Sequence, residues 1–205
     1  MPFPGNGIRY VIGGTLPSGE VWSTGVYGAQ IGNPNDLQAL VDGQVQSGSL
    51  FLAVVAALRP MLPAGAAVTS ITAYRYENGR QATGTATAAV TNAGGTGAVV
   101  HPNSMAMCVT LRTALANRRG RGRMFFPASG LGLTASALFA TNQVTSLLTP
   151  LGAWLDQINA EVWSSVGTTK NRVSRIDADL VPDDISSRRD RLRTPRQTVA
   201  IATPD

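Results

Sequence analysis

The chain has 205 residues, of which 43 % are hydrophobic and 14 % charged, and its formal net charge is +5. A single cysteine, Cys108, excludes an intrachain disulfide and a multi-cysteine zinc site, and a single histidine, His101, argues against a histidine-led triad or metal cluster. The longest apolar stretch, Leu50–Leu58, is too short to cross a bilayer, so we expect no membrane partner. We also expect no cofactor.

The N-terminal stretch predicts a pair of strands. Arg9–Gly13 and Glu20–Tyr27 have the composition of short strands, and Pro17-Ser18-Gly19 between them is a turn signal. We expect Trp22 to pack against the core or against a neighbouring subunit.

A helix is predicted after this pair, because apolar residues recur at helical spacing over 37–55. Asn35 or Asp36 is placed to cap the N–H groups of the first turn. Gly43 and Gly48 each weaken a helix by about 1 kcal/mol relative to alanine. The two glycines therefore predict a break in the middle.

The clearest hairpin follows. Val68–Tyr76 and Gln81–Val90 are rich in β-forming residues, and Asn78-Gly79 between them supplies the positive-φ residues of a type I′ turn. The next segment, 91–97, reads TNAGGTG, and we expect a flexible link there.

A second hairpin with an arginine-rich connection lies at the centre of the chain. Met105–Leu111 alternates apolar and small or polar residues, as a strand with one buried face does. The apolar run 124–126 resumes the pattern, and Pro127 is expected to stop it because proline has no N–H to donate. This hairpin would present four arginines together in its loop, namely Arg118, Arg119, Arg121 and Arg123.

The C-terminal third contains the strongest helix signal. Segment 134–148 is ambiguous, but Thr149-Pro150 matches an N-cap followed by proline at the first helical position. The stripe that follows consists of Leu151, Trp154, Leu155, Ile158 and Val162.

A closing strand and a basic arm are predicted last. Arg172–Val181 has the composition of a strand, and five arginines then fall within residues 188–196. We expect one domain over 1–184 and an Arg-rich arm over 185–205 that becomes ordered only against a partner.

The order of elements predicts an α+β fold, with an antiparallel sheet built from hairpins and two helices packed on one face. An all-β sandwich or jelly roll is the alternative if the first helix is misassigned. No internal sequence repeat is present.

Charge is distributed unevenly. Residues 1–111 contain as many acidic as basic residues, so the whole surplus lies in 112–205, and all basic residues except Lys170 are arginine. Charged residues are well below the roughly 25 % of an average globular protein, so much of the surface must be neutral. A neutral surface of small residues suits a chain covered by copies of itself, although a GC-rich coding bias would give a similar composition.

The candidate functional residues are arginines, whose guanidinium groups suit phosphates and carboxylates. They would contact nucleic acid without sequence preference or pair with carboxylates of a neighbouring subunit; a solvated turn without function is the third interpretation. The candidates are Arg112, Arg118, Arg119, Arg121, Arg123, Arg188, Arg189, Arg191, Arg193 and Arg196.

Catalytic and metal chemistry find little support. Asp177 and Asp179 would share one face of a strand, but two carboxylates without a third ligand are more simply a solvated face that balances Arg172 and Arg175. The glycine-rich run 93–97 lacks the lysine of a P-loop. We therefore predict that the protein is not an enzyme and holds no metal.

Three stretches together resemble small structural proteins of bacterial virus particles: the early GTLPSGEVWSTG, the central CVTLRTALANRRGRGRMFFPA and the Arg-rich tail after a closing strand. The resemblance implies a coat, tail or connector component that self-assembles, whose partners are copies of itself, other virion proteins and genomic nucleic acid. It implies synthesis in the host cytoplasm and a final location in the virion. The alternative is a nucleic-acid-binding module without sequence preference.

Overall fold

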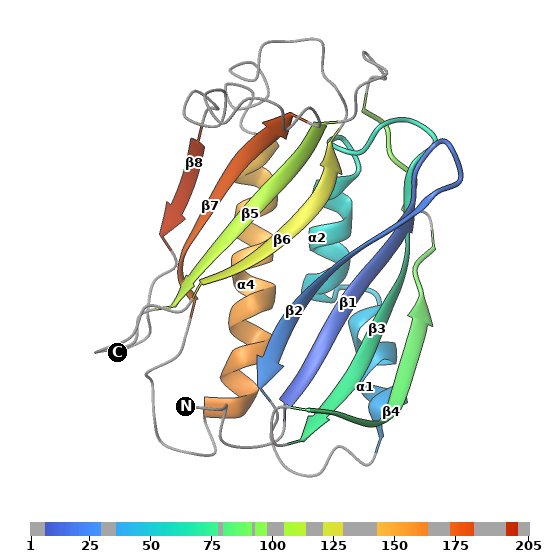
Figure 1. The fold of residues 1–205 in the computed structure, drawn as a ribbon, viewed down its shortest axis with the longest axis vertical. Coiled ribbons are helices and arrows are strands. Elements are labelled where there is room, and N and C mark those ends of the chain that lie inside the picture. The colour runs from blue at the N-terminus through green and yellow to red at the C-terminus, as the bar shows by residue number, and fades with distance from the viewer. Residues whose placement is uncertain are drawn as a thin grey trace.

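The computed structural model describes residues 7–29, 36–77, 80–91, 93–97, 105–113, 121–128, 143–163, 173–182 and 196–200. These residues form two four-stranded antiparallel sheets with strand orders β2-β1-β3-β4 and β6-β5-β7-β8 (Figure 1). The predicted α+β class is confirmed, with the helices on one side of the strands and not as a sandwich of two stacked sheets. The elements are β1 (Gly7–Thr15), β2 (Val21–Ala29), α1 (Leu37–Gln44), α2 (Leu50–Leu58), β3 (Ala67–Glu77), β4 (Arg80–Ala89), β5 (Met105–Thr113), β6 (Arg121–Ala128), α4 (Gln143–Trp163), β7 (Val173–Pro182) and β8 (Arg196–Ala200).

The two sheets repeat one topology. In the first half of the chain, the hairpin β1–β2 is followed by helices and then by the hairpin β3–β4, with β3 beside β1. In the second half, the hairpin β5–β6 is followed by α4 and then by β7–β8, with β7 beside β5. The structure therefore contains an internal repetition that the sequence does not reveal.

The sheets lie side by side and share one layer of helices. Strand β2 contacts β6, and the rings of Trp22 and Phe126 meet edge to face with their centroids 6.3 Å apart. Helix α4 packs against α2 and also contacts β2, β7 and β8 (Figure 1). Because elements of the two halves interleave, both halves share one hydrophobic core.

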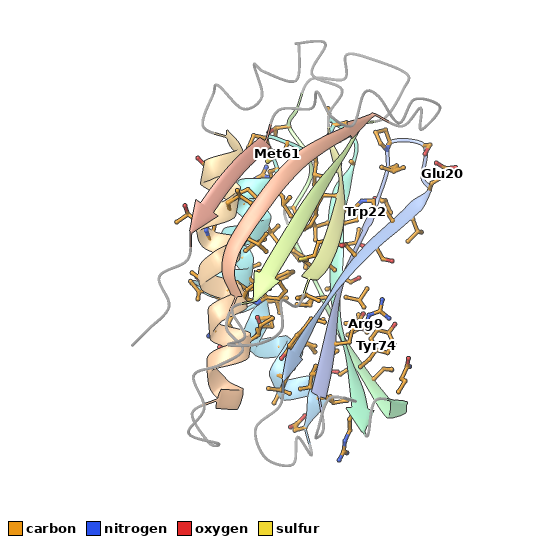
Figure 2. The ribbon with its side chains drawn as sticks, turned by 60° about the vertical axis from the view of Figure 1, so that its left-hand side comes forward. Arg9, Glu20, Trp22, Met61 and Tyr74 are labelled. Atoms are coloured by element: carbon orange, nitrogen blue, oxygen red, sulfur yellow. The ribbon has the colours of Figure 1, made fainter. Side chains whose placement is uncertain are left out.

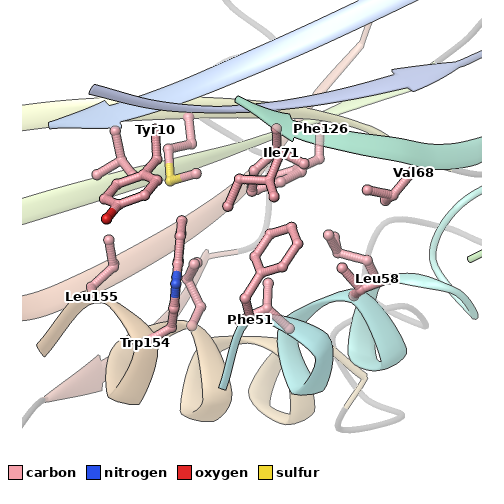
Figure 3. Close-up of a cluster of buried hydrophobic side chains, with 14 of the residues drawn as sticks. Tyr10, Phe51, Leu58, Val68, Ile71, Phe126, Trp154 and Leu155 are labelled. Carbon is pink, nitrogen blue, oxygen red and sulfur yellow. The ribbon is translucent and has the colours of Figure 1, made fainter. Parts of the chain in front are cut away.

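Trp154 of α4 occupies the centre of that core (Figure 3). Its ring lies 5.4 Å from that of Phe51 and 6.2 Å from that of Tyr10, measured between centroids. The indole Nε1 donates a hydrogen bond of 2.7 Å to Oε1 of Gln44 at the end of α1. A single side chain thus joins α4 to α1, α2 and β1.

The predicted helix break is confirmed. Helix α1 ends at Gln44, Gly48 adopts a φ of +84°, and α2 begins after Ser49, whose hydroxyl accepts from the N–H of Leu52. A left-handed φ of this kind is inexpensive only for glycine. Of the two capping candidates, Asp36 is the N-cap of α1, and its Oδ1 accepts from the N–H of Ala39 at 2.9 Å.

Replacing Asp36 with alanine is expected to lower the free energy of unfolding by about 1 kcal/mol, because a first-turn N–H of α1 loses its acceptor. Urea denaturation followed by circular dichroism measures the change. Asp36→Asn is the control, since it removes the charge and retains a capping oxygen. Equal losses in both variants would show that the charge, and not the cap, stabilises this helix start.

Two predictions about prolines are wrong. Pro150 lies inside α4 and not at its first turn, because the helix begins at Gln143. An interior proline costs about 3 kcal/mol, and burial of Leu147 and Leu148 in the added turns, worth roughly 1.5–3 kcal/mol each, offsets that cost. Pro127 does not stop its strand: β6 extends through it to Ala128, as an edge strand permits.

Two segments expected to be loosely held make regular contacts. In the predicted link 91–97, the N–H groups of Gly95 and Gly97 donate to Ala66 and Leu62. At the C-terminus, residues 196–200 of the predicted arm form β8 and pair with β7, so this part belongs to the second sheet. The rest of the arm, the turn 78–79 and the arginine loop 114–120 lie outside the described residues.

Candidate interaction surface

Each sheet has one face packed on the helices and one face turned away from them (Figure 2). Ile8, Tyr10 and Ile12 of β1 are buried beneath the sheet, and the residues that alternate with them lie on the other side. Within the described residues, no helix covers this second side of either sheet. We call it the open face.

The open face of the first sheet is neutral except at one position. Small and hydroxyl-bearing side chains dominate it, and Thr72 and Thr87 on neighbouring strands share a hydrogen bond of 2.9 Å between their hydroxyls. Register and alternation assign to it Arg9, Val11, Gly13, Thr15, Val21, Ser23, Gly25, Ser70, Thr72, Tyr74, Thr85, Thr87 and Ala89.

Arg9 lies along this face. A Cβ atom added at Gly25 of β2 would come within 2.9 Å of the Arg9 Nε, so the guanidinium group crosses β2 where glycine leaves room. The register places Tyr74 of β3 directly opposite Arg9 on the other side, and Figure 2 shows the two side chains next to each other. The guanidinium group of Arg9 therefore lies over the backbone of β2 at Gly25.

The register of the second sheet is given by its strand pairing. Met124 and Phe126 of β6 are buried in the shared core. Arg121 is paired with Arg112 of β5. Arg112 is paired in turn with a residue of β7, Arg175. Arginine therefore occupies directly paired positions on three adjacent strands, β6, β5 and β7.

Two aspartates of β7 lie at neighbouring positions of the same pairing. Thr110 is paired with Arg123 on one side and with Asp177 on the other, and Asp179 is paired with Arg196 of β8. The sequence prediction that Asp177 and Asp179 share a strand face agrees with this register.

Four of the ten predicted site residues thus meet on one sheet: Arg112, Arg121, Arg123 and Arg196. Arg121 and Arg123 are not loop residues as predicted, because β6 begins at Arg121. Arg175, which the sequence analysis did not select as a candidate, is paired with Arg112 in the same sheet. The other six candidates, Arg118, Arg119, Arg188, Arg189, Arg191 and Arg193, lie outside the described residues.

The outer edge of the first sheet is partly covered. Gln38 of α1 donates from Nε2 to the backbone carbonyl of Thr87 on the edge strand β4, at 3.4 Å, and to Oδ1 of Asp42 at 2.8 Å. An edge with an occupied carbonyl is a poor template for a further strand. The open faces are therefore the broader surfaces left for a partner.

Comparisons with protein-family models, with curated proteins and with solved structures found no match to this chain. Among the described side chains, no three His, Cys, Asp or Glu residues lie close enough together to hold a metal ion. In the same part of the chain, no helix has the length and hydropathy to span a membrane.

Proposed function

We propose that this protein is a structural subunit of a virus particle, of the bacterial-virus kind that its sequence resembles, and that it works by association with copies of itself. The observation that carries the proposal is the one-sided fold: one layer of helices packs beneath two sheets and leaves their other faces uncovered by any described helix. Other virion proteins and the packaged genome are further proposed partners. The proposed location is the virion, after synthesis in the host cytoplasm.

The open face of the first sheet is the proposed contact between copies. Charged residues are depleted at the centres of protein interfaces because their desolvation is costly. This face meets that requirement, since Arg9 is the only charged residue among its assigned positions. Its hydroxyl groups, such as those of Thr72 and Thr85, would supply hydrogen bonds at low cost in side-chain entropy.

Assembly of the purified protein tests the proposal. Light scattering over a rising concentration series, with electron microscopy of the same samples, is expected to show growth from small species to rings or closed particles. Val11→Glu is expected to abolish this growth, because it places a carboxylate at the centre of the face, between Gly25 and Thr72. Ser47→Glu, in the exposed turn between α1 and α2, is the matched control and is expected to assemble normally.

A protein that stays monomeric at every concentration would contradict the proposal.

The second candidate, a free nucleic-acid-binding module, is favoured by the arginine positions of the second sheet. It predicts a monomer that binds oligonucleotides with an affinity that falls steeply as salt rises.

A further inference from the structure

Helix α2 is apolar on every side. Each residue of Leu50–Leu58 is leucine, phenylalanine, alanine or valine. A helix that faces water normally carries polar or charged side chains on its outer side, whereas a helix that is apolar all round is normally buried. Four residues of α2 are buried in the shared core, but Ala53 and Ala56 on the opposite side of the helix are exposed. The composition of α2 therefore indicates that its outer side is covered.

The other helix of the first half has a different exposed side. Gln38 and Asp42 occupy exposed positions of α1, and Nε2 of Gln38 donates a hydrogen bond of 2.8 Å to Oδ1 of Asp42. Both helices lie on the same side of the first sheet (Figure 1). The lack of polar residues is thus a property of α2 and not of the helical layer.

Helix α4 lies beside α2 and extends its outer side. Both helices turn buried side chains, such as Phe51 and Trp154, toward the sheets (Figure 3), so their exposed residues lie on the outer side of the layer. We call this side of α2 and α4 the outer helical face. Among the described side chains of α4, the exposed ones are uncharged, namely Ser146, Thr149, Ala153 and Gln157. A helix of nine residues is only about 13 Å long, so the adjacent α4 supplies much of the area that an interface requires.

Growth of an assembly requires a second contact surface. If the open face of the first sheet meets the same face of another copy, that contact closes a pair and leaves neither open face free. A ring or particle then needs another surface on each copy. The outer helical face lies on the side of the molecule opposite the open faces. A pair joined through its open faces would therefore present an outer helical face at each end.

We propose that the outer helical face binds the same face of a second copy, with α2 packed on α2 across a two-fold axis. Close to such an axis each residue meets its own counterpart, so a charged residue would meet a like charge. Ala53 and Ala56 avoid that repulsion, and their small side chains let the two helix axes approach to about 8 Å. Removal of these alanines and of the half-buried Leu52 from water would drive the contact. The inference rests on the proposed function and deepens it, since it names the second contact between copies.

Sedimentation of four full-length proteins over one concentration series tests the second contact. Ala53→Glu is expected to stop growth at a pair held by the open faces, with twice the chain mass of 21.4 kDa. Val11→Glu is expected to stop growth at a pair of the same mass, held by the outer helical faces. The variant with both changes is expected to remain a monomer, and the wild type is expected to grow further.

A mixing experiment identifies the occupant of the face as a second copy. Ala53→Lys alone is expected to stop at a pair, as Ala53→Glu does, because like charges meet across the axis. An equimolar mixture of the two variants is expected to recover growth, because a carboxylate then meets an ammonium group. An unrecovered mixture would overturn the two-fold contact.

Ala39→Glu is the matched control, since Ala39 is an exposed alanine of α1, outside the outer helical face. It is expected to assemble as the wild type does. Both Ala53 variants are expected to unfold at about the wild-type temperature, because the position is exposed and glutamate and lysine are good helix formers. A marked loss of thermal stability in both would assign the face to a covering segment of the same chain and overturn the inference.

Other outcomes separate this inference from the proposed function. Unchanged growth of Ala53→Glu would overturn the helical contact and leave the proposed function standing. A monomeric Val11→Glu variant beside a growing wild type would do the same. A wild type that stops at a pair, which Ala53→Glu dissociates and Val11→Glu does not, would support the helical contact and contradict growth through the open face.

Discussion

Replacing Trp154 with alanine is expected to lower the free energy of unfolding by about 3–5 kcal/mol, as removal of large buried aromatic side chains does. The indole is fully buried between Tyr10 of β1 and Phe51 of α2, and its N–H donates to Gln44. Since globular domains are stable by only about 5–15 kcal/mol, this one change removes much of the total. Denaturant unfolding followed by far-ultraviolet circular dichroism measures it.

Trp154→Phe is the companion variant. It keeps an aromatic ring in the core and removes the donor to Oε1 of Gln44, so a smaller loss of about 1–2 kcal/mol is expected. A loss below about 1 kcal/mol for Trp154→Ala would show that the core can close around the vacated space, contrary to the packing described above.

The second large effect is expected at Gly14, where a change to alanine should lower the free energy of unfolding by about 3 kcal/mol through overpacking. Gly14 lies at the irregularity in the pairing of β1 with β3. A Cβ atom there would overlap the backbone carbonyl of Ala67 and the indole ring of Trp22. Because Trp22 packs against Phe126 of the second sheet, the substitution would also disturb the contact between the sheets.

Gly43→Ala is the control for that substitution. Gly43 lies within α1, and nothing lies within 4 Å of the position that its Cβ would take. Alanine is the better helix former by about 1 kcal/mol, so this variant should be more stable than the wild type. If both glycine variants shifted the denaturation midpoint in the same direction, the steric explanation for Gly14 would fail.

Local signals in the sequence predicted local structure well. The pairing of β3 with β4, the capping position of Asp36 and the apolar stripe through Trp154 each depend on residues close together in the chain. The failure at Pro150 has a physical cause as well. The preference of proline for the first turn stabilises a helix start only slightly. Burial of Leu147 and Leu148 contributes more to the free energy of folding, so the helix begins before them, at Gln143.

The candidate site was predictable in composition and not in arrangement. The arginine-rich stretch is visible in the sequence, but the level of Arg175 beside Arg112 depends on a pairing between strands more than 50 residues apart. The doubled topology was invisible for a related reason. Within the described residues, the two short helices α1 and α2 of the first half correspond to the long helix α4 of the second, and no sequence repeat accompanies the shared strand order.

The covalent joining of two halves with one topology has a consequence for how the two outer surfaces can differ. Two identical chains related by a rotation axis must present the same residues on both sides of that axis. In a single polypeptide, the linker keeps the halves at a high effective concentration, so they stay together without being identical. Corresponding strand positions of the two halves can therefore carry different residues, as do Val11 of β1, paired with Gly25 and Thr72, and Arg112 of β5, paired with Arg121 and Arg175; a symmetric pair of chains does not allow this.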